Sequence, residues 1–434
     1  MSPSLTLVES LVSAVPFSLL PDTSTTADDG SLSIGGCSVV ELAGAYGTPL
    51  FIYDEAHLRA RCREAVAAFG DQAVYAGKAF LCLAMAKLAH EEGLRIDVAS
   101  GGELFVALAA GVPGERLVMH GNNKSMDELE EAAKAGVGRL VVDSFDELDR
   151  IIELHDRTGH VFDALIRVTP GIEAHTHHYV ATGQDDSKFG FTLSTGVASA
   201  AVNAARSNPG IRLRGCHLHI GSQVFRVGSF SSALEAMADF VRSHRLEELS
   251  MGGGLGVPYV AGESAPSITE YARILKESAD GAGLDVVLSA EPGRAIAAAA
   301  AVTVYTVGTV KEIPGIRTYV SVDGGMSDNP RPVLYGSGYE AFLPRAVRAD
   351  RPRRVRVVGK HCESGDVLVR EAMVPEDLAV GDFLAMPVTG AYGHSMGSNY
   401  NKVPRPAVVF AADGNARLVV ARESFEDLIR NDRL

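Results

Sequence analysis

Between residues 50 and 310, short apolar or β-branched runs alternate with longer segments rich in Ala, Leu and Glu. Most of the runs end in polar or glycine residues. Alternating strands and helices predict a parallel sheet, because each parallel strand needs a crossover connection before the next one. The predicted strands lie at residues 73–77, 95–99, 116–120, 139–143, 164–168, 213–220, 248–251 and 285–290.

Eight strand–helix units over about 250 residues match the usual size of a closed (β/α)8 barrel of the TIM type. Helical patterns lie between the strands, for example at residues 125–135, 144–155 and 268–282. An open doubly wound sheet is the alternative that strand counting alone leaves. We therefore predict an α/β fold with a barrel over residues 56–310.

The pattern changes after residue 310. Runs at residues 317–322, 354–359, 381–386 and 407–410 are separated by Gly, Pro and Asp turns, with few helical stretches. This spacing predicts a C-terminal antiparallel β domain over residues 311–434. A further strand, near Ser38 or at residues 50–53, precedes the barrel, so residues 31–55 are predicted to join that domain.

Composition and charge narrow the class of protein. The 434 residues are 46% hydrophobic and 22% charged, which is ordinary for a globular chain of two domains. The formal net charge of -14 and the lack of a basic run argue against nucleic acid or an anionic membrane as a partner. No apolar stretch approaches the roughly 18 residues of a membrane span. Residues 1–30, rich in Ser, Thr and Asp, are predicted to form a partly disordered extension.

The cysteines are scattered and odd in number, and no CxxC pair occurs, so neither a zinc site nor a disulfide framework is expected. We expect no metal. The N-terminus has no basic leader before an apolar segment, which favours a cytoplasmic protein with reduced thiols. The five cysteines are Cys37, Cys62, Cys82, Cys216 and Cys362.

Polar residues follow almost every predicted barrel strand, at the position where barrel enzymes carry their functional groups. Lys78 follows the first strand, and a lysine amine near apolar groups and other cations can lose its proton and form a Schiff base. Taken alone, Lys78 would more often be a solvated surface lysine. Glu291, after the eighth strand, could hold a protonated ring nitrogen or simply cap its own turn.

The other strand ends are each open to two interpretations. The turn Gly252, Gly253 and Gly254 offers backbone N–H groups to a phosphate, although a plain tight turn is as common. Arg294 could pair with a phosphate or carboxylate. His219 could lie on a ring face or be a core histidine. In the β domain, Cys362 and Glu363 could be a proton donor and a cation-binding carboxylate, or part of a loop with a buried thiol.

Nine short motifs resemble those of the diaminopimelate decarboxylase family, in that family's order. They include Tyr-Ala-Gly-Lys-Ala at 75–79, His-Gly-Asn-Asn-Lys at 120–124, Glu-Pro-Gly-Arg at 291–294 and Cys-Glu-Ser-Gly-Asp at 362–366. The others lie at residues 97–104, 187–190, 217–223, 323–326 and 390–392. These enzymes are fold-type III, alanine-racemase-like decarboxylases that use pyridoxal 5'-phosphate. The resemblance runs from about residue 35 to the C-terminus.

The resemblance implies a role for each matching residue. Lys78 would hold the cofactor as a Schiff base, and Cys362 would give the proton that replaces CO2. The cofactor would further contact His219 on its ring, Glu291 at its nitrogen, and Ser222, Gly252, Gly253, Gly254, Arg294 and Tyr392. The substrate would contact Arg294, Arg331, Tyr335, Glu363 and Tyr392.

The family also implies a reaction and an assembly. The reaction would convert meso-2,6-diaminopimelate to L-lysine and CO2, the last step of lysine biosynthesis. Cys362 and Glu363 would reach the active site of a second subunit, so a homodimer with shared sites is implied. His394 and Pro330 depart from the expected pattern and leave room for a specialised relative with another substrate.

Three alternatives remain from the sequence. One is a related decarboxylase acting on a D-amino acid, an ornithine-like substrate or a carrier-bound substrate. Another is a racemase on the same fold, which needs a second base, usually a tyrosine, facing Lys78; the Cys362–Glu363 cluster argues against it. The third is a non-catalytic pyridoxal-phosphate-binding protein, which would resemble a lone barrel.

Overall fold

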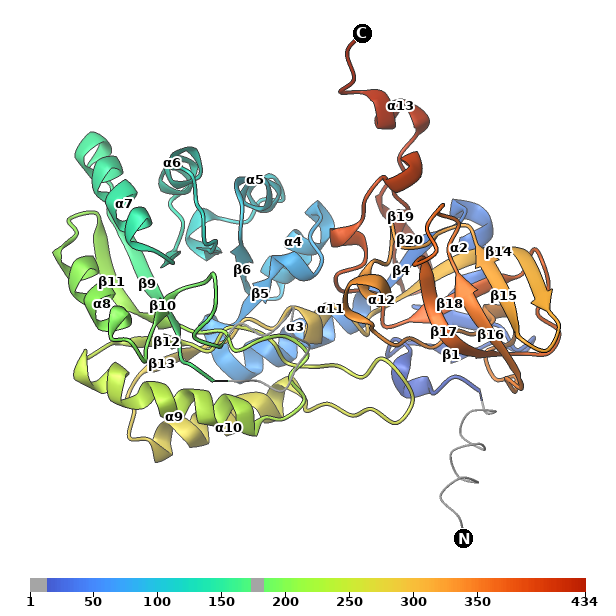
Figure 1. Cartoon of the computed structure of the whole chain (residues 1–434), viewed down its shortest axis with the longest axis horizontal. Helices are drawn as coiled ribbons and strands as arrows, with labels where there is room; N and C mark the ends of the chain where they lie inside the picture. The colour runs from blue at the N-terminus through green and yellow to red at the C-terminus, as the bar shows by residue number, and fades with distance from the viewer. Residues whose placement is uncertain (1–13, 173–182) are drawn as a thin grey trace. The chain divides into compact units, whose positions relative to one another are not determined.

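The structure, a computed structural model, describes residues 14–172 and 183–434 (Figure 1). The chain divides into two compact units. The β unit comprises the chain up to Leu58, Pro258–Ser264 and Ala297–Leu434; the barrel unit comprises Arg59–Val257 and Ala265–Ile296. No helix within the described ranges is long and apolar enough to cross a membrane.

The barrel unit is built on a parallel sheet whose strands follow chain order, which confirms the predicted fold. An isolated parallel bridge between Ala73 and Ala290, with Val74 N donating to Ala290 O at 3.0 Å, joins the first and last strands. The strands are β5 (Val74–Ala76), β6 (Arg95–Val98), β7 (Leu117–Met119), β8 (Arg139–Val142), β9 (Phe162–Thr169), β11 (Ile211–His217), β12 (Glu248–Ser250) and β13 (Val287–Ser289). A short strand, β10 (Phe191–Thr192), also pairs with β9.

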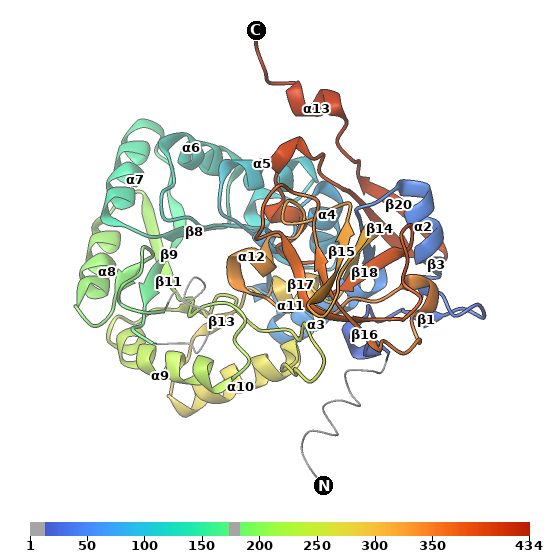
Figure 2. The same cartoon turned by 45° about the vertical axis from the view of Figure 1, so that its right-hand side comes forward.

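Helices connect these strands and surround the sheet (Figure 2). Four of them begin after a serine that is followed by a glutamate three residues later, and each serine Oγ accepts the backbone N–H of that glutamate. This Ser-x-x-Glu pattern is why helices start at these points. The helices are α3 (Glu55–Phe69), α4 (Leu83–Glu91), α5 (Gly101–Ala109), α6 (Met126–Ala135), α7 (Phe145–Thr158), α8 (Val197–Ser207), α9 (Gly228–Ser243) and α10 (Ile268–Gly281).

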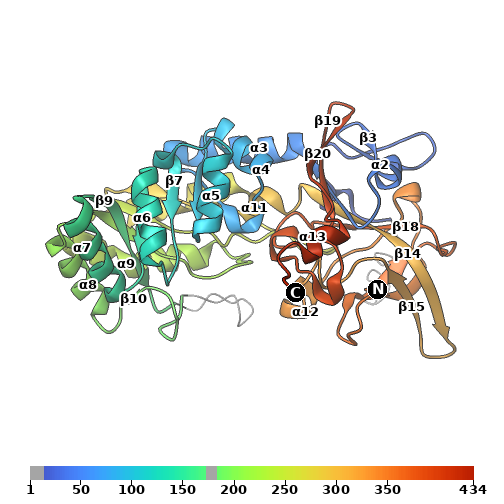
Figure 3. The same ribbon diagram turned by 90° about the horizontal axis from the view of Figure 1, so that it is seen from above.

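The β unit holds a sheet in the order β17-β16-β15-β14-β4-β19-β20, with β18 also paired to β14. The longest strand of this sheet, β14, forms an antiparallel hairpin with β15 (Figure 3). The strands are β4 (Leu50–Asp54), β14 (Ala301–Ile313), β15 (Arg317–Val322), β16 (Arg353–Val358), β17 (Val367–Val374), β18 (Phe383–Pro387), β19 (Ala407–Ala412) and β20 (Asn415–Val420).

This sheet is mixed, whereas the sequence predicted an antiparallel one. The β15–β16 and β4–β19 pairs are parallel, and the other pairs are antiparallel. Parallel neighbours need long connections, and both pairs have them: the segment that contains α12 (Arg331–Tyr335) joins β15 to β16, and most of the chain separates β4 from β19. The central strand β14 begins at Ala301, before the predicted start of the domain at residue 311.

The N-terminal extension is described only from residue 14, so the disorder expected for residues 1–13 lies outside the described residues. The first described residues are packed, because Val15 and Leu20 are buried in one apolar cluster with Leu32 and Ile34, whereas residues 25–29 are exposed. The remaining elements are α2 (Val39–Tyr46), α11 (Arg294–Ala297), α13 (Phe425–Ile429), the small sheet β1 (Thr25–Thr26), β2 (Leu32–Ile34) and β3 (Cys37–Ser38), and 3-10 turns at Phe17–Leu19, Gly70–Gln72, Gly77–Ala79, Gly114–Arg116, Pro344–Ala346, His394–Met396 and Tyr400–Lys402.

Candidate active site

Glu291 is the centre of a polar cluster at the carboxyl ends of the barrel strands. Its side chain is buried just after β13. His217, the last residue of β11, places Nε2 3.2 Å from Glu291 Oε2, and Ser250, the last residue of β12, donates its hydroxyl to Oε1 at 3.0 Å. His120 Nε2 lies 3.4 Å from Oε1. The parallel strands bring these groups together because their carboxyl ends share one edge.

Burial and the electrostatic interactions among these side chains set their pKa values. Burial alone would raise the pKa of Glu291, but His217 and His120 hold it well below its ordinary value. Burial lowers the pKa of His217 to about 4. Near neutral pH, Glu291 is therefore a carboxylate and His217 a neutral imidazole that can donate an N–H to it.

The same three side chains, His120, His217 and Glu291, are close enough to ligate one metal ion. No metal was expected from the sequence. A buried carboxylate with two imidazoles and a hydroxyl beside it can equally hold an organic cation, such as a protonated ring nitrogen.

Lys78 lies at the same edge of the barrel. It follows β5 in the turn Gly77–Ala79, and its side chain is exposed. The neighbouring glycine is required there, because a Cβ on Gly77 would lie 2.7 Å from Asp97 O. Burial raises the pKa of Asp97, and the positive charges of His120 and Lys78 act against that rise. The amine of Lys78 is thus accessible and close to buried acids of the strand ends.

His219 and Arg167 complete the ionisable groups around Glu291. Burial, and after it the positive charges of Lys78 and Arg167, lower the pKa of His219 well below its ordinary value, so its ring is neutral. A neutral imidazole suits contact with a flat ring face. Arg167, in β9, lies with its guanidinium 4.2 Å from the centre of the Phe189 ring.

The glycine turn after β12 adopts backbone conformations that other residues resist. Gly252 has φ +62° and Gly254 has φ +114°. A Cβ on Gly254 would lie 2.1 Å from Gly221 O, which no side chain could tolerate. Nearby, Arg294 Nη2 donates to Ser222 Oγ at 2.7 Å. Backbone amides, a hydroxyl and a guanidinium are the groups that bind phosphate.

The remaining predicted site residues belong to the β unit. Arg331, the first residue of α12, is buried and donates from Nη1 to Tyr339 OH at 2.6 Å, with its guanidinium 4.1 Å from the centre of the Tyr259 ring. Tyr335, the last residue of α12, is half-buried. Tyr392 is also half-buried and has φ +60°, a left-handed conformation that is uncommon for a tyrosine.

Cys362 and Glu363 lie in an exposed turn, so the alternative of a buried thiol is wrong. Cys362 N donates to Asn401 Oδ1 at 3.1 Å. The buried Asp366 holds the turn, because its carboxylate accepts the backbone N–H groups of His361 at 3.0 Å and Met326 at 2.7 Å. A pocket of about 500 Å³ opens beside the thiol, lined by Thr48, Pro49, Asp323, Lys360, Cys362, Asn401, Lys402, Val403, Pro404, Arg422 and Phe425.

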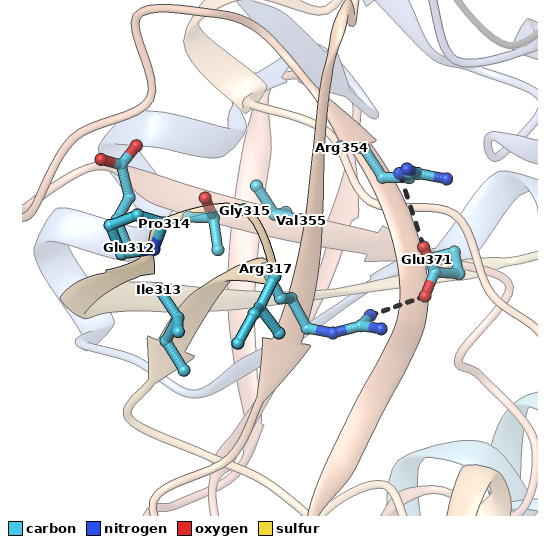
Figure 4. A pocket seen from close by; sticks show the side chains of 10 residues that line it. Glu312, Ile313, Pro314, Gly315, Arg317, Arg354, Val355 and Glu371 are labelled. Atoms are coloured by element: carbon cyan, nitrogen blue, oxygen red, sulfur yellow. Dashed lines mark hydrogen bonds and ion pairs between the residues drawn. The ribbon is translucent and has the colours of Figure 1, made fainter.

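A larger cavity of about 640 Å³ in the β unit contains none of the predicted site residues. It lies at the β14–β15 hairpin, where Arg317 and Arg354 flank Glu371 (Figure 4). Guanidinium groups surrounding one carboxylate neutralise its charge and lower the pKa of Glu371. The cavity has no acid, base or nucleophile that is left in an unusual charge state.

The barrel unit thus brings together the predicted residues Lys78, His219, Ser222, Gly252, Gly253, Gly254, Glu291 and Arg294. The sequence interpretation assigned no site role to five further residues that share this edge, although each stands at or near the end of a strand it had predicted. Their position could have identified them. They are Asp97, His120, Arg167, His217 and Ser250.

Residues 55–298 match the family described as "Pyridoxal-dependent decarboxylase, pyridoxal binding domain". Over 429 residues the chain is 45% identical to the diaminopimelate decarboxylase of Bacillus subtilis, covering 95% of this chain and 98% of that protein. The chain belongs to the diaminopimelate decarboxylase family.

Other members of the diaminopimelate decarboxylase family agree in sequence and in fold. The Mycobacterium tuberculosis enzyme is 46% identical over 427 residues, covering 93% of this chain and 96% of that protein. The crystal structure of the diaminopimelate decarboxylase from "m. jannaschii", in complex with L-lysine, superposes with a TM-score of 0.88 at 31% identity, covering 95% of this chain and 98% of that one. A lysine/ornithine decarboxylase from Vibrio vulnificus, at 22% identity and a TM-score of 0.73, shares the fold.

Proposed function

We propose that this chain is a pyridoxal-phosphate-dependent decarboxylase that converts meso-2,6-diaminopimelate to L-lysine and CO2, the last step of lysine biosynthesis. One observation carries the proposal: an accessible amine, Lys78, and a buried, ionised carboxylate, Glu291, share the strand-end edge of the barrel. Membership of the diaminopimelate decarboxylase family supports the choice of substrate.

The barrel residues fit pyridoxal phosphate. Lys78 would hold it covalently, Glu291 would bind its ring nitrogen, and the neutral His219 would lie on its ring. When bound, this group supplies an electron sink for the electron pair that CO2 leaves behind. Its phosphate would be bound by Ser222, Gly252, Gly253, Gly254 and Arg294, with Tyr392 as a further contact.

Glu291 has the main electrostatic role in this proposal. Its carboxylate would hold a proton on the ring nitrogen of the bound group, and the resulting positive charge would stabilise the charge that develops in the transition state. Ser250 and His217 orient the two carboxylate oxygens by hydrogen bonds. Since these donors are fixed by the ends of β12 and β11, the carboxylate needs little reorganisation during the reaction.

The β-unit residues would select the substrate. Diaminopimelate carries a carboxylate and an ammonium at its distal end. Arg331, together with Arg294, suits the carboxylate, and Glu363 suits the ammonium. Tyr335 and Tyr392 would line the same site, and the Cys362 thiol would donate a proton to the α-carbon.

We further propose that the enzyme is a homodimer in which Cys362 and Glu363 complete the site of the partner chain. Both residues are exposed, so they are available to a second subunit. We also place the enzyme in the cytoplasm. All five cysteines are free thiols, which is typical of a reducing compartment.

The decisive experiment incubates the purified protein with pyridoxal phosphate and meso-diaminopimelate and measures lysine and CO2. The same assay is run with D-amino acids, with ornithine and with a racemisation readout. We expect CO2 release that is fastest with meso-diaminopimelate. Faster release from another amino acid would make the chain a relative with a different substrate, and racemisation without CO2 would overturn the proposal.

A further inference from the structure

Apart from His120, the residues of two motifs of the barrel unit, at 120–124 and 187–190, have no role in the proposed mechanism. The first ends in Lys124, whose ammonium is buried behind the strand ends. Lys124 Nζ donates to Gly121 O and to Val141 O, both at 2.7 Å, and pairs with Glu147 Oε1 at 2.7 Å. Both side chains of the pair are only 1% exposed. Two hydrogen bonds and one ion pair thus hold the buried ammonium.

Glu147 connects the buried ion pair to the end of β8 by a hydrogen bond. It is the third residue of α7, and its backbone N–H is accepted by Ser144 at the helix start. Its second carboxylate oxygen, Oε2, accepts the backbone N–H of Asp143 at 2.9 Å. The buried pair therefore fixes the backbone of the residue that directly follows the strand.

The carboxylate of Asp143 contacts both the second motif, at residues 187–190, and Arg167. Its Oδ1 accepts the backbone N–H of Gly190 at 2.7 Å, and its Oδ2 lies 3.7 Å from Arg167 Nη1. Phe189 covers the Arg167 guanidinium. Gly190, with φ +70°, is needed for this contact, because a Cβ there would lie 2.8 Å from Arg167 O.

Arg167 is the point at which this chain of contacts meets the candidate active site. Its guanidinium is buried, and its charge interacts with those of Asp97 and Glu291. An arginine is flexible, so its charge acts at one place only if neighbouring groups hold the side chain there. Asp143, Phe189 and Gly190 provide that constraint.

We propose that the buried Lys124–Glu147 pair is a positioning device for the active site. It fixes Asp143, which holds the guanidinium of Arg167 in place on β9, where Arg167 is the register partner of His217, the residue that contacts Glu291. Stability alone is a poor reason for such a pair, since apolar residues of similar volume often stabilise a core as well as a buried ion pair does. The inference rests on the proposed function only in that Glu291 is taken as the cofactor's partner.

The test replaces the pair with apolar residues in the variant Lys124→Met/Glu147→Leu. A matched control, Lys134→Met/Glu131→Leu, removes an exposed pair of the same 2.7 Å separation on α6. We expect the buried-pair variant to fold but to lose about tenfold to a hundredfold in kcat/KM, since a displacement of about 1 Å can cost that much. The control keeps wild-type kinetics.

A second variant, Asp143→Asn, leaves the buried pair in place. It keeps the proposal testable if the first variant fails to fold. We expect it to reproduce the loss, and we expect the two changes combined to cost no more than either alone, because they act on one chain of contacts. Two measurements report on the cofactor's surroundings in the absence of substrate. One is the visible circular dichroism of bound pyridoxal phosphate, and the other is the affinity of the apoprotein for pyridoxal phosphate. Both should change in both variants.

Kinetics and circular dichroism within twofold of wild type in the folded Lys124→Met/Glu147→Leu protein would overturn the inference. So would losses that add in the combined variant. Failure of the proposed function is distinguishable, because it would appear as absence of decarboxylation in the wild-type protein, whereas the circular dichroism and affinity measurements need no turnover.

Discussion

Glu291 and Asp328 are both buried carboxylates, but their surroundings move their pKa values in opposite directions. Imidazoles beside Glu291 keep it ionised in spite of burial. Asp328 accepts hydrogen bonds from Tyr305 OH at 2.6 Å and Gly325 N at 2.8 Å, which only partly offset burial. Burial raises the pKa of Asp328 to about 7. A residue's type therefore does not fix its charge inside this protein.

The raised pKa of Asp328 predicts a pH-dependent stability. Between about pH 4 and pH 7 the folded state holds a proton that the unfolded state has released, so the free energy of unfolding falls as pH rises. Asp328→Asn removes this titration. The free energy of unfolding of the variant minus that of wild type should increase by about 2–3 kcal/mol as the pH rises from 5 to 8, as measured by urea unfolding. A pH-independent difference would contradict the assigned pKa.

Lys78→Ala should abolish both the covalent cofactor and the decarboxylation. Activity should fall by several orders of magnitude, because loss of a covalent group is among the most severe changes an enzyme can suffer. Mass spectrometry after borohydride reduction checks the adduct. Lys87→Ala, which removes an exposed lysine from α4, is the matched control and should retain the adduct and the activity.

At the scale of elements, serine caps determine where several barrel helices begin. In α6 the cap is reciprocal: Ser125 Oγ accepts the N–H of Glu128, and the Glu128 carboxylate accepts the N–H of Ser125 at 2.9 Å. In α5 and α7 the glutamate instead bonds the residue before the cap, Ala99 or Asp143, which belongs to the strand end. The same local pattern thus either closes a helix or ties it to the barrel edge.

Ser125→Ala should destabilise the protein by about 1 kcal/mol, because the helix N-terminus loses a side-chain acceptor. Chemical denaturation measures the change. Ser207→Ala, at an exposed position at the end of α8, should alter stability by less than about 0.5 kcal/mol. Equal effects at the two positions would show that the cap contributes nothing specific.

At the scale of the whole molecule, the proposed homodimer makes a quantitative prediction. Lys78→Ala and Cys362→Ala subunits are each expected to be inactive, but they remove groups from different parts of a shared site. After mixing and reassembly, half of the dimers are hybrids, and each hybrid has one intact site. The mixture should recover about a quarter of wild-type activity.

Size-exclusion chromatography would confirm that the reassembled species is a dimer, and unmixed variants carried through the same procedure are the controls. Recovery of no activity from verified hybrid dimers would show that Lys78 and Cys362 act within one chain, whereas full activity of the unmixed Cys362→Ala protein would show that Cys362 has no role in catalysis.

The sequence alone determined the alternation of strands and helices and the motifs that identify the family. These features are local, since hydrophobic periodicity and Ser-x-x-Glu caps act within a few residues. It also placed Lys78 and Glu291 at strand ends, which is sufficient in a barrel because all strand ends share one edge.

Only the tertiary structure decided the rest. The parallel pairing of β4 with β19 depends on segments far apart in the chain, which no local pattern encodes. The same is true of the charge states of Glu291 and Asp328, which depend on burial and on neighbours from other strands. Nothing in the sequence distinguishes Lys124 from an ordinary polar residue. Its proposed role depends on Glu147 and two carbonyl oxygens that surround its ammonium only in the folded protein.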